Sequence, residues 1–123
     1  MALQDFYTLQ PITKIAENNY STVIAIHPGH EVFKGHFPGN PVVPGVTVMH
    51  IVKKIAEQAA GVPLTLKTAV NVKFLSLINP EINPELIADL EITEAGDNCI
   101  KVKSTIKFND TAAVKLSCIY KTN

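Results

Sequence analysis

One stretch of helical length stands among strand-like runs, and this restricts the folds open to the chain. Residues 46–60 are rich in apolar side chains, with Pro44 just before them and Gly61 just after them as start and stop signals. The polar positions fall at spacings of three and four and so share one face: His50, Lys53, Lys54, Glu57 and Gly61. We therefore expect a largely buried helix with a single polar stripe.

The rest of the chain predicts strands. Residues 6–16 are compatible with a strand in which Pro11 marks an edge or a bulge, and residues 21–27 are rich in β-branched side chains. Four further strands are expected, separated by turn signals such as Gly96-Asp97-Asn98 and Asn109-Asp110: residues 66–77, 86–94, 99–108 and 112–120. This order predicts one α+β domain over residues 1–123, an antiparallel sheet wrapped around one central helix.

The composition limits the class of protein. At 123 residues and 46% hydrophobic content, the chain is long enough to bury a core without disulfides or metal. Its apolar runs stop short of the roughly 18–20 residues that span a bilayer, and the N-terminus lacks the pattern of a signal peptide. We expect no membrane span and a cytoplasmic protein. Cys99 and Cys118 lack metal-ligand spacing and lie in strand-like runs, which predicts packing roles.

The charges are balanced, with eleven acidic and eleven basic residues, and every basic residue is a lysine. The bidentate arginine forks that read phosphates and guanine edges are missing, so nucleic acid is not an expected partner. Lysines alternate with apolar residues over 99–108, while Asp89 and Glu91 lie on the polar face of the preceding strand. Cross-strand charge pairing accounts for most of these lysines better than a dedicated binding patch does.

A rigid loop over residues 33–45 holds His36 and ends where the helix begins. Its three prolines fix their own φ and its three glycines permit special turns, so the loop has few conformations. This arrangement predicts an imidazole placed for chemistry. His27 and His30, which flank a strand end, are expected to be structural. The four histidines lack the spacing and companion carboxylates of a metal site, so no metal is expected.

The motif around His36 resembles that of a known enzyme family. The strings Gly35-His36-Phe37-Pro38-Gly39-Asn40-Pro41 and Pro44-Gly45-Val46 are similar to the loop-and-helix motif of the β-hydroxyacyl-(acyl-carrier-protein) dehydratases of fatty acid synthesis. The element order resembles that family's hot-dog fold. The resemblance implies a homodimer, or an oligomer of such dimers, whose two sheets join and whose acyl tunnels lie at the subunit interface. It also implies an acyl-carrier-protein or CoA thioester as substrate, and no cofactor.

Dehydration of a 3-hydroxyacyl thioester requires a base for the C2 proton, a donor for the departing hydroxyl and a dipole for the carbonyl oxygen. The resemblance implies His36 as the base, a role that suits an imidazole with an ordinary pKa of about 6.5. It assigns the dipole to the amide N–H of Gly45 or Val46, at the start of the helix. Phe37 and Pro38, beside His36 in the motif, are implied substrate contacts.

The second catalytic position departs from that family. His50 stands where the family carries glutamate or aspartate, and Lys54 where glutamine is common. As an imidazolium, His50 would donate the proton, but Lys53 and Lys54 are expected to lower its pKa and disfavour that form. Glu57 is expected to pair with Lys53. A neutral His50 still serves to orient water or to bond the substrate, and an exposed structural role stands equally beside these.

Three functions follow from these residues. The first is a hydroxyacyl-thioester dehydratase with His36 and His50 as catalytic residues. The second is a thioesterase, since one fold hosts several reactions, although the helix lacks the carboxylate that this route typically uses. The third is a non-catalytic acyl- or carrier-binding subunit that works with a homologue supplying the missing acid. A His36→Ala substitution tests the first, because it removes the base.

Overall fold

The computed structural model describes residues 6–30, 32–35 and 42–122. Their elements follow one another along the chain as β1 (Tyr7–Leu9), β2 (Thr13–Ala16), β3 (Asn19–Ile26), α1 (Val32–Gly35), α2 (Gly45–Ala60), β4 (Leu64–Phe74), β5 (Glu85–Glu94), β6 (Cys99–Phe108) and β7 (Thr111–Thr122). The strands form one antiparallel sheet in the order β1-β3-β5-β6-β7-β4, with β2 also paired to β3. No helix in the described ranges has the length and apolarity needed to cross a membrane.

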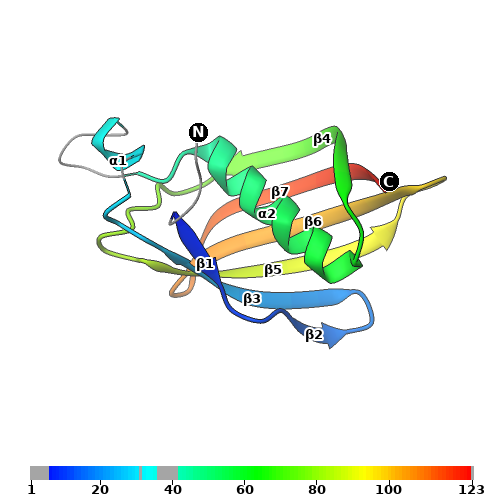
Figure 1. The fold of residues 1–123 in the computed structure, drawn as a ribbon, viewed down its shortest axis with the longest axis horizontal. Helices are drawn as coiled ribbons and strands as arrows, with labels where there is room; N and C mark the ends of the chain where they lie inside the picture. Colours follow the sequence, from blue (N-terminus) through cyan, green and yellow to red (C-terminus); the bar gives the residue numbers. More distant parts are fainter. Residues whose placement is uncertain (1–5, 31, 36–41, 123) are drawn as a thin grey trace.

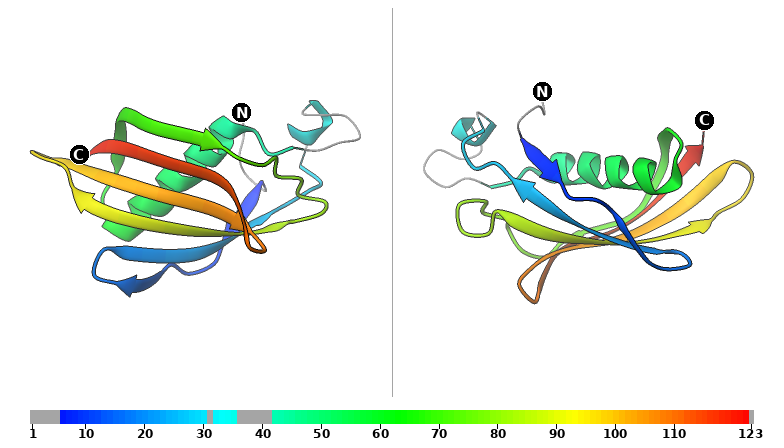
Figure 2. Two further views of the ribbon diagram at one scale, coloured as in Figure 1. Left: turned by 180° about the vertical axis from the view of Figure 1, so that it is seen from behind. Right: turned by 60° about the horizontal axis from the view of Figure 1, so that its bottom comes forward.

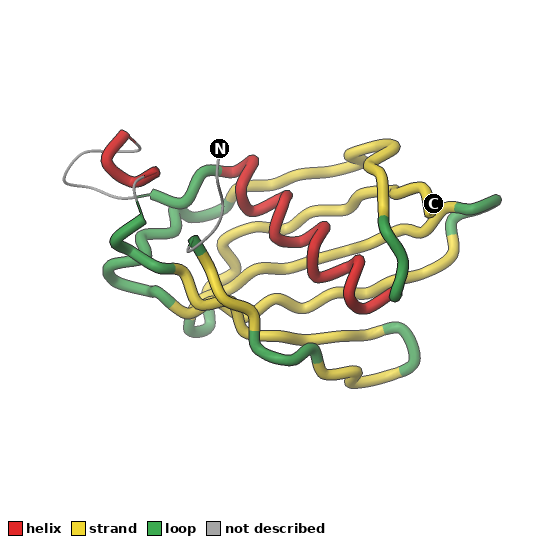
Figure 3. Tube along the Cα trace, viewed as in Figure 1, coloured by secondary structure: helices red, strands yellow, loops and turns green. Residues whose placement is uncertain are grey.

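The sheet and α2 form two layers. α2 crosses one face of the sheet (Figure 1), and the sheet curves around it when the molecule is turned (Figure 2). The secondary-structure colouring shows this single long helix against the strands (Figure 3). The side of α2 that faces the sheet is buried along its length: Thr47, Val48, Ile51, Val52, Ile55 and Ala56. The predicted α+β architecture, a sheet wrapped around a central helix, is confirmed.

Both ends of α2 lie within one residue of the prediction. The helix begins after Pro44, which has extended backbone angles and makes no side-chain cap. It ends at Gly61, whose left-handed φ of 75° suits a residue without a Cβ atom, and the Gly61 N–H donates to the Glu57 carbonyl. The connection from α2 to β4 is short, since β4 begins at Leu64. Across it, the Glu57 carboxylate accepts the N–H of Leu64 at 2.8 Å. The end of α2 is thereby attached to the start of β4.

Two segments differ from the sequence prediction. β4 ends at Phe74, three residues before the predicted limit, because the N–H groups of Leu75 and Ser76 both donate to the carbonyl of Ala113, so that pairing with β7 stops advancing. The predicted loop of residues 33–45 begins inside a short helix, α1 (Val32–Gly35), which the turn from His30 initiates. The predicted interruption near Pro11 is confirmed, since it separates β1 from β2.

β4 is an edge strand with an unusual surface. Among the described strands it pairs with β7 alone, and most of its residues are exposed. Large apolar side chains stand on it in solvent: Leu66, Val70 and Phe74. Edge strands of soluble proteins are ordinarily short, charged or covered. The β4 edge departs from this rule, because it is long and exposes apolar side chains.

The predictions for the cysteines and for one charged pair are confirmed. Cys99 and Cys118 are buried free thiols in the sheet. Across β5 and β6, Lys107 Nζ lies 3.0 Å from the Asp89 carboxylate, with both side chains partly exposed. Such a pair contributes little net stability, typically below about 1 kcal/mol, and acts mainly to satisfy the charge of the strand face.

Candidate active site

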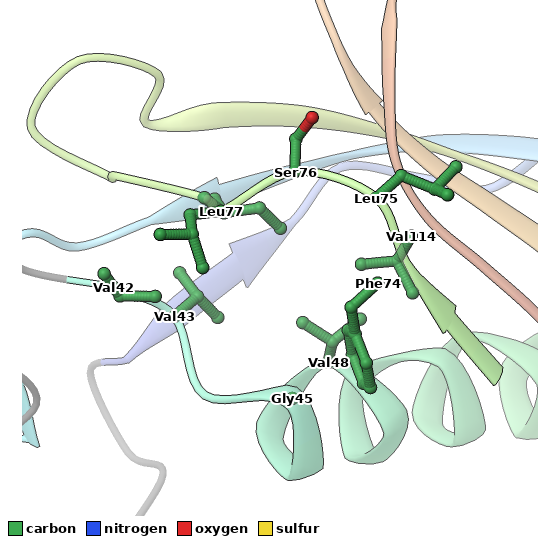
Figure 4. A pocket seen from close by; sticks show the side chains of 10 residues that line it. Val42, Val43, Gly45, Val48, Phe74, Leu75, Ser76, Leu77 and Val114 are labelled. Carbon is green, nitrogen blue, oxygen red and sulfur yellow. The ribbon is translucent and has the colours of Figure 1, made fainter.

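An apolar cavity of about 440 Å³ opens at the N-terminal end of α2. Three segments and one β7 residue line it: Val42 and Val43 before the helix, Gly45 and Val48 in it, Phe74 to Ile78 at the end of β4, and Val114. Figure 4 shows these side chains converging from separate segments, with the Phe74 ring pointing from β4 toward the first turns of α2. Apart from the hydroxyl of Ser76, the lining side chains are apolar. Such a surface suits a hydrocarbon chain.

The first turn of α2 supplies the polar end of this cavity. The N–H groups of Thr47 and Val48 both donate to the Pro44 carbonyl, at 3.1 and 3.2 Å. Among the described residues, none accepts a hydrogen bond from the N–H of Gly45 or of Val46. Unpaired N–H groups at a helix start carry the positive end of the helix dipole. The end of α2 therefore presents two donors to an oxygen atom beside an apolar cavity.

Gly45 is in close contact with Phe74. A Cβ atom at position 45 would lie 2.7 Å from Cζ and 2.9 Å from Cε1 of the Phe74 ring, closer than real Cβ contacts come. Gly45 has ordinary helical geometry, since its φ is not among the positive ones. An alanine here would require the Phe74 ring to shift, whereas the backbone itself would accept it.

His50 lies one turn beyond Val46 and is half-buried. It is not among the residues that line the cavity of this protomer. Burial lowers the pKa of His50 first, followed by the charges of Lys54 and Lys53, while Glu57 opposes them. The predicted effect of the lysines is confirmed, and the imidazole is mainly neutral at physiological pH because its pKa lies below the ordinary 6.5.

The prediction for the partner of Glu57 was wrong. Its carboxylate lies 3.5 Å from Lys54 Nζ and forms no ion pair with Lys53 in the described structure. The cause is the bond from Leu64, which holds the other carboxylate oxygen and thereby orients the group. This backbone hydrogen bond is also the main reason that the pKa of Glu57 is lowered.

Of the remaining histidines and predicted site residues, the structure describes His27 and His30 only. His36, Phe37 and Pro38 lie outside the described residues, so their predicted roles stay predictions. His27 Nε2 is 2.9 Å from the Thr8 hydroxyl, and the His30 ring packs edge-on against Phe6 with centroids 5.1 Å apart. Both contacts are those of structural residues. In the described ranges, no three His, Cys, Asp or Glu side chains are grouped as a metal site would require.

The segment after Phe74 was not predicted as part of the site. Residues 74–77 are predicted as the end of a strand over residues 66–77, and their apolar side chains carry no sign of a cavity. Only the topology, which places the end of β4 beside the start of α2, brings them to the helix N-terminus. The sequence signal was limited to their apolar character.

The arrangement of the sheet around α2 defines the class of fold. The chain has a hot-dog fold, as its similarity to two solved structures shows. One is the dehydratase heterocomplex ApeI:P from Xenorhabdus doucetiae, with 18% identity, a TM-score of 0.73 and coverage of 94% of this chain and 97% of that one. The other is a putative thioesterase from Lactococcus lactis, with 11% identity, a TM-score of 0.72 and coverage of 99% and 98%.

The sequence comparison identifies the family. The ApeI-like family, described as ApeI dehydratase, matches residues 12–115, and the chain belongs to it. A 3-hydroxyacyl-[acyl-carrier-protein] dehydratase FabZ of Lactobacillus helveticus is 33% identical over 90 residues, which cover 68% of this chain and 60% of that protein. FabZ of Caulobacter sp. is 27% identical over 92 residues, 68% of this chain and 55% of that protein. The chain therefore spans little more than half the length of these relatives. The predicted relationship to the hydroxyacyl dehydratases is confirmed.

Proposed function

We propose that the protein dehydrates a 3-hydroxyacyl thioester carried by acyl carrier protein or CoA. The observation that carries this proposal is an apolar cavity lined by Gly45, at the helix start where the N–H groups of Gly45 and Val46 have no acceptor among the described residues. An acyl thioester fits both features, because its carbonyl oxygen accepts hydrogen bonds at the helix start while its hydrocarbon chain lies in the apolar cavity. Membership of a dehydratase family supports the reaction type.

In this mechanism the helix start stabilises negative charge. When the C2 proton leaves, charge develops on the thioester oxygen, and in this proposal the N–H groups of Gly45 and Val46 bind it. His36 takes the C2 proton, as the motif implies. The C3–O bond then breaks, a double bond forms between C2 and C3, and the hydroxyl leaves as water after receiving a proton.

His50 is the proposed second residue at the departing hydroxyl. A neutral imidazole donates a hydrogen bond to that oxygen through its ring N–H and orients it, while the proton itself comes from solvent or from the protonated base. The lowered pKa of His50 favours this role over donation by an imidazolium. A glutamic acid at this position would supply the proton directly.

The proposed assembly is a homodimer, or an oligomer of such dimers, in which the β4 edges of two copies meet. The position of β4 at an edge of the sheet and its exposed apolar residues support this arrangement. Light scattering measures the assembly directly. A Val70→Lys substitution, which places a charge at the centre of this edge, should reduce the mass to that of the monomer. An unchanged mass would contradict the β4 interface.

A second candidate function rests on the absence of a carboxylate at position 50. In that case the chain is one half of a heteromeric dehydratase, and a homologue with an acidic residue in its helix supplies the proton donor. A heteromeric dehydratase complex has a fold similar to this chain. Activity that appears only when the two chains are mixed would support this candidate over the homodimer.

The test is turnover of 3-hydroxyacyl thioesters, followed by the ultraviolet absorbance of the conjugated product. The purified chain should form the enoyl thioester, and His36→Ala should abolish the activity. His27→Ala serves as the control, since His27 bonds Thr8 and should leave the rate largely intact. Release of free thiol without an enoyl product would identify a thioesterase and contradict the proposal.

His50→Glu separates the roles of the second residue. A strong rise in rate would mean that the native chain lacks its acid, as the heteromeric candidate requires. A fall would mean that the imidazole has its own part in the reaction. The pH dependence distinguishes them further, because only the glutamate variant should gain activity at lower pH, where its carboxyl group is protonated.

A further inference from the structure

The Phe74 ring occupies a position that burial does not explain. Its side chain is 57% exposed, although it is large and apolar, and it is not part of the core cluster. A phenylalanine ring is ordinarily held in place by being buried. Here the ring instead reaches from the last residue of β4 across to the first turn of α2 (Figure 4).

The opposite side of this contact is shaped to receive the ring. Gly45 is the first residue of α2, and any side chain there would collide with the ring, at 2.7 Å from its Cζ atom. The ring therefore rests directly on the backbone that carries the proposed carbonyl donors. Of the described residues that line the cavity, Phe74 alone is aromatic, and the others present smaller side chains.

We propose that Phe74, seated on Gly45, limits the size of the acyl group that the cavity accepts next to the reacting thioester. This inference rests on the proposed function, because it concerns the same cavity. The ring lines the cavity and lies against the helix start at Gly45, so its edge sets how much space the first carbons of the chain have there. A smaller side chain at position 74 enlarges the cavity, and a displaced Phe74 ring changes its shape.

The contact predicts opposite effects for two substitutions. Phe74→Ala enlarges the site, so longer or branched acyl groups gain affinity relative to short ones. Gly45→Ala pushes the ring from its seat, so every acyl group loses affinity. Pockets of this kind discriminate by about tenfold or more for each methylene that they admit or reject, which sets the size of the expected shift.

The double variant Gly45→Ala/Phe74→Ala separates the ring from the donor. Both alanines retain the N–H at position 45, so a loss caused by collision disappears once the ring is gone. We expect Gly45→Ala to weaken acyl binding about tenfold in the presence of Phe74 and by much less in its absence, a non-additivity typical of residues in contact. Equal losses in both backgrounds would overturn the inference.

The experiment measures binding and turnover in parallel. Calorimetry gives the affinities of saturated short-, medium- and branched-chain acyl-CoA thioesters, which lack the 3-hydroxyl and are not consumed, and the absorbance assay gives rates on the hydroxylated forms. Phe74→Leu accompanies Phe74→Ala as a milder variant whose fold is disturbed less. Ile82→Ala is the control, because Ile82 is an exposed apolar residue that does not line the cavity.

The outcomes distinguish this inference from the proposed function. A shift in chain preference of about tenfold in the Phe74 variants, with none in Ile82→Ala, supports the inference, even where the chain proves to have no dehydratase turnover. Turnover with an unchanged preference overturns the inference and leaves the proposed function intact. Absence of binding to every acyl thioester overturns both.

Discussion

The Glu57 carboxylate accepts the backbone N–H of Leu64 at 2.8 Å, and this bond joins the last turn of α2 to the first residue of β4. Its other oxygen is 3.5 Å from Lys54 Nζ. The two interactions hold one side chain between the helix and the edge strand. Since the cavity is built from the other ends of these same two elements, Glu57 helps to fix their relative position.

Glu57→Ala should lower the free energy of unfolding by about 1–2 kcal/mol, because it leaves a backbone N–H without its charged acceptor. Glu57→Gln, which retains an acceptor oxygen, should cost less. The pKa of Glu57 lies below its ordinary 4.5, so this stabilisation is present above that pH and is lost as pH falls through the lowered pKa. Urea unfolding curves across the acidic range measure it. An identical pH dependence in the alanine variant would contradict the assignment.

His50 should titrate below the ordinary histidine pKa of 6.5. Since the folded state disfavours its protonated form, the fold loses stability as pH falls from that value through the lowered pKa. Lys54→Gln removes a positive charge and should raise the His50 pKa, whereas Lys101→Gln, on the polar face of the sheet, should not. Proton NMR titration of the imidazole resonances gives each value. A His50 pKa above 6.5 in the unaltered protein would reverse the proposed role.

Gly61→Ala should destabilise the protein by about 1 kcal/mol, because alanine tolerates the left-handed region poorly. The Gly61 φ is 75°, and its N–H ends the helix on the Glu57 carbonyl. Gly29→Ala is the matched control, since Gly29 has open space around it and no positive φ. Thermal melts compare the two. Equal stability of both variants would contradict a role for the left-handed backbone of Gly61 in ending the helix.

Ile106→Ala should cost about 2–5 kcal/mol, because Ile106 is fully buried in the same core cluster as the inner face of α2 and its truncation leaves a cavity. Ile87→Ala is the control, an isoleucine on the neighbouring strand that is 38% exposed. Its replacement should cost much less. Denaturant unfolding with the slope checked for both variants measures the difference. A comparable loss in the two would contradict the burial of Ile106 in the core.

Much of the fold could be predicted because its signals are local. Pro44 and Gly61 mark the two ends of the helix, and the turn at Gly96 marks the β5–β6 hairpin, within a few residues of each event. The end of β4 could not be predicted in this way. Phe74, Leu75 and Leu77 continue the apolar pattern of a strand, while the actual limit depends on how Ala113, far along the chain, receives two N–H groups.

The same distinction between local features and long-range contacts applies to the candidate site. Gly45 and Val46 were predicted from the motif, because a helix start is a local feature with a known electrical character. The role of Phe74 was not predicted, because a phenylalanine at the end of a strand has the same sequence appearance whether it faces a core, a cavity or solvent. Its contact with Gly45 depends on two elements meeting across the molecule.

The position of β4 in the sheet also determines when the cavity can be completed during synthesis. Among the described strands β4 pairs with β7 alone, and β7 is made after β5 and β6, which intervene in the sequence. Pairings between distant segments form late because the chain between them must be ordered first. The cavity wall at Phe74 is therefore assembled only after residues 111–122 have left the ribosome, so a truncated chain retains the helix start without its hydrocarbon-binding surface.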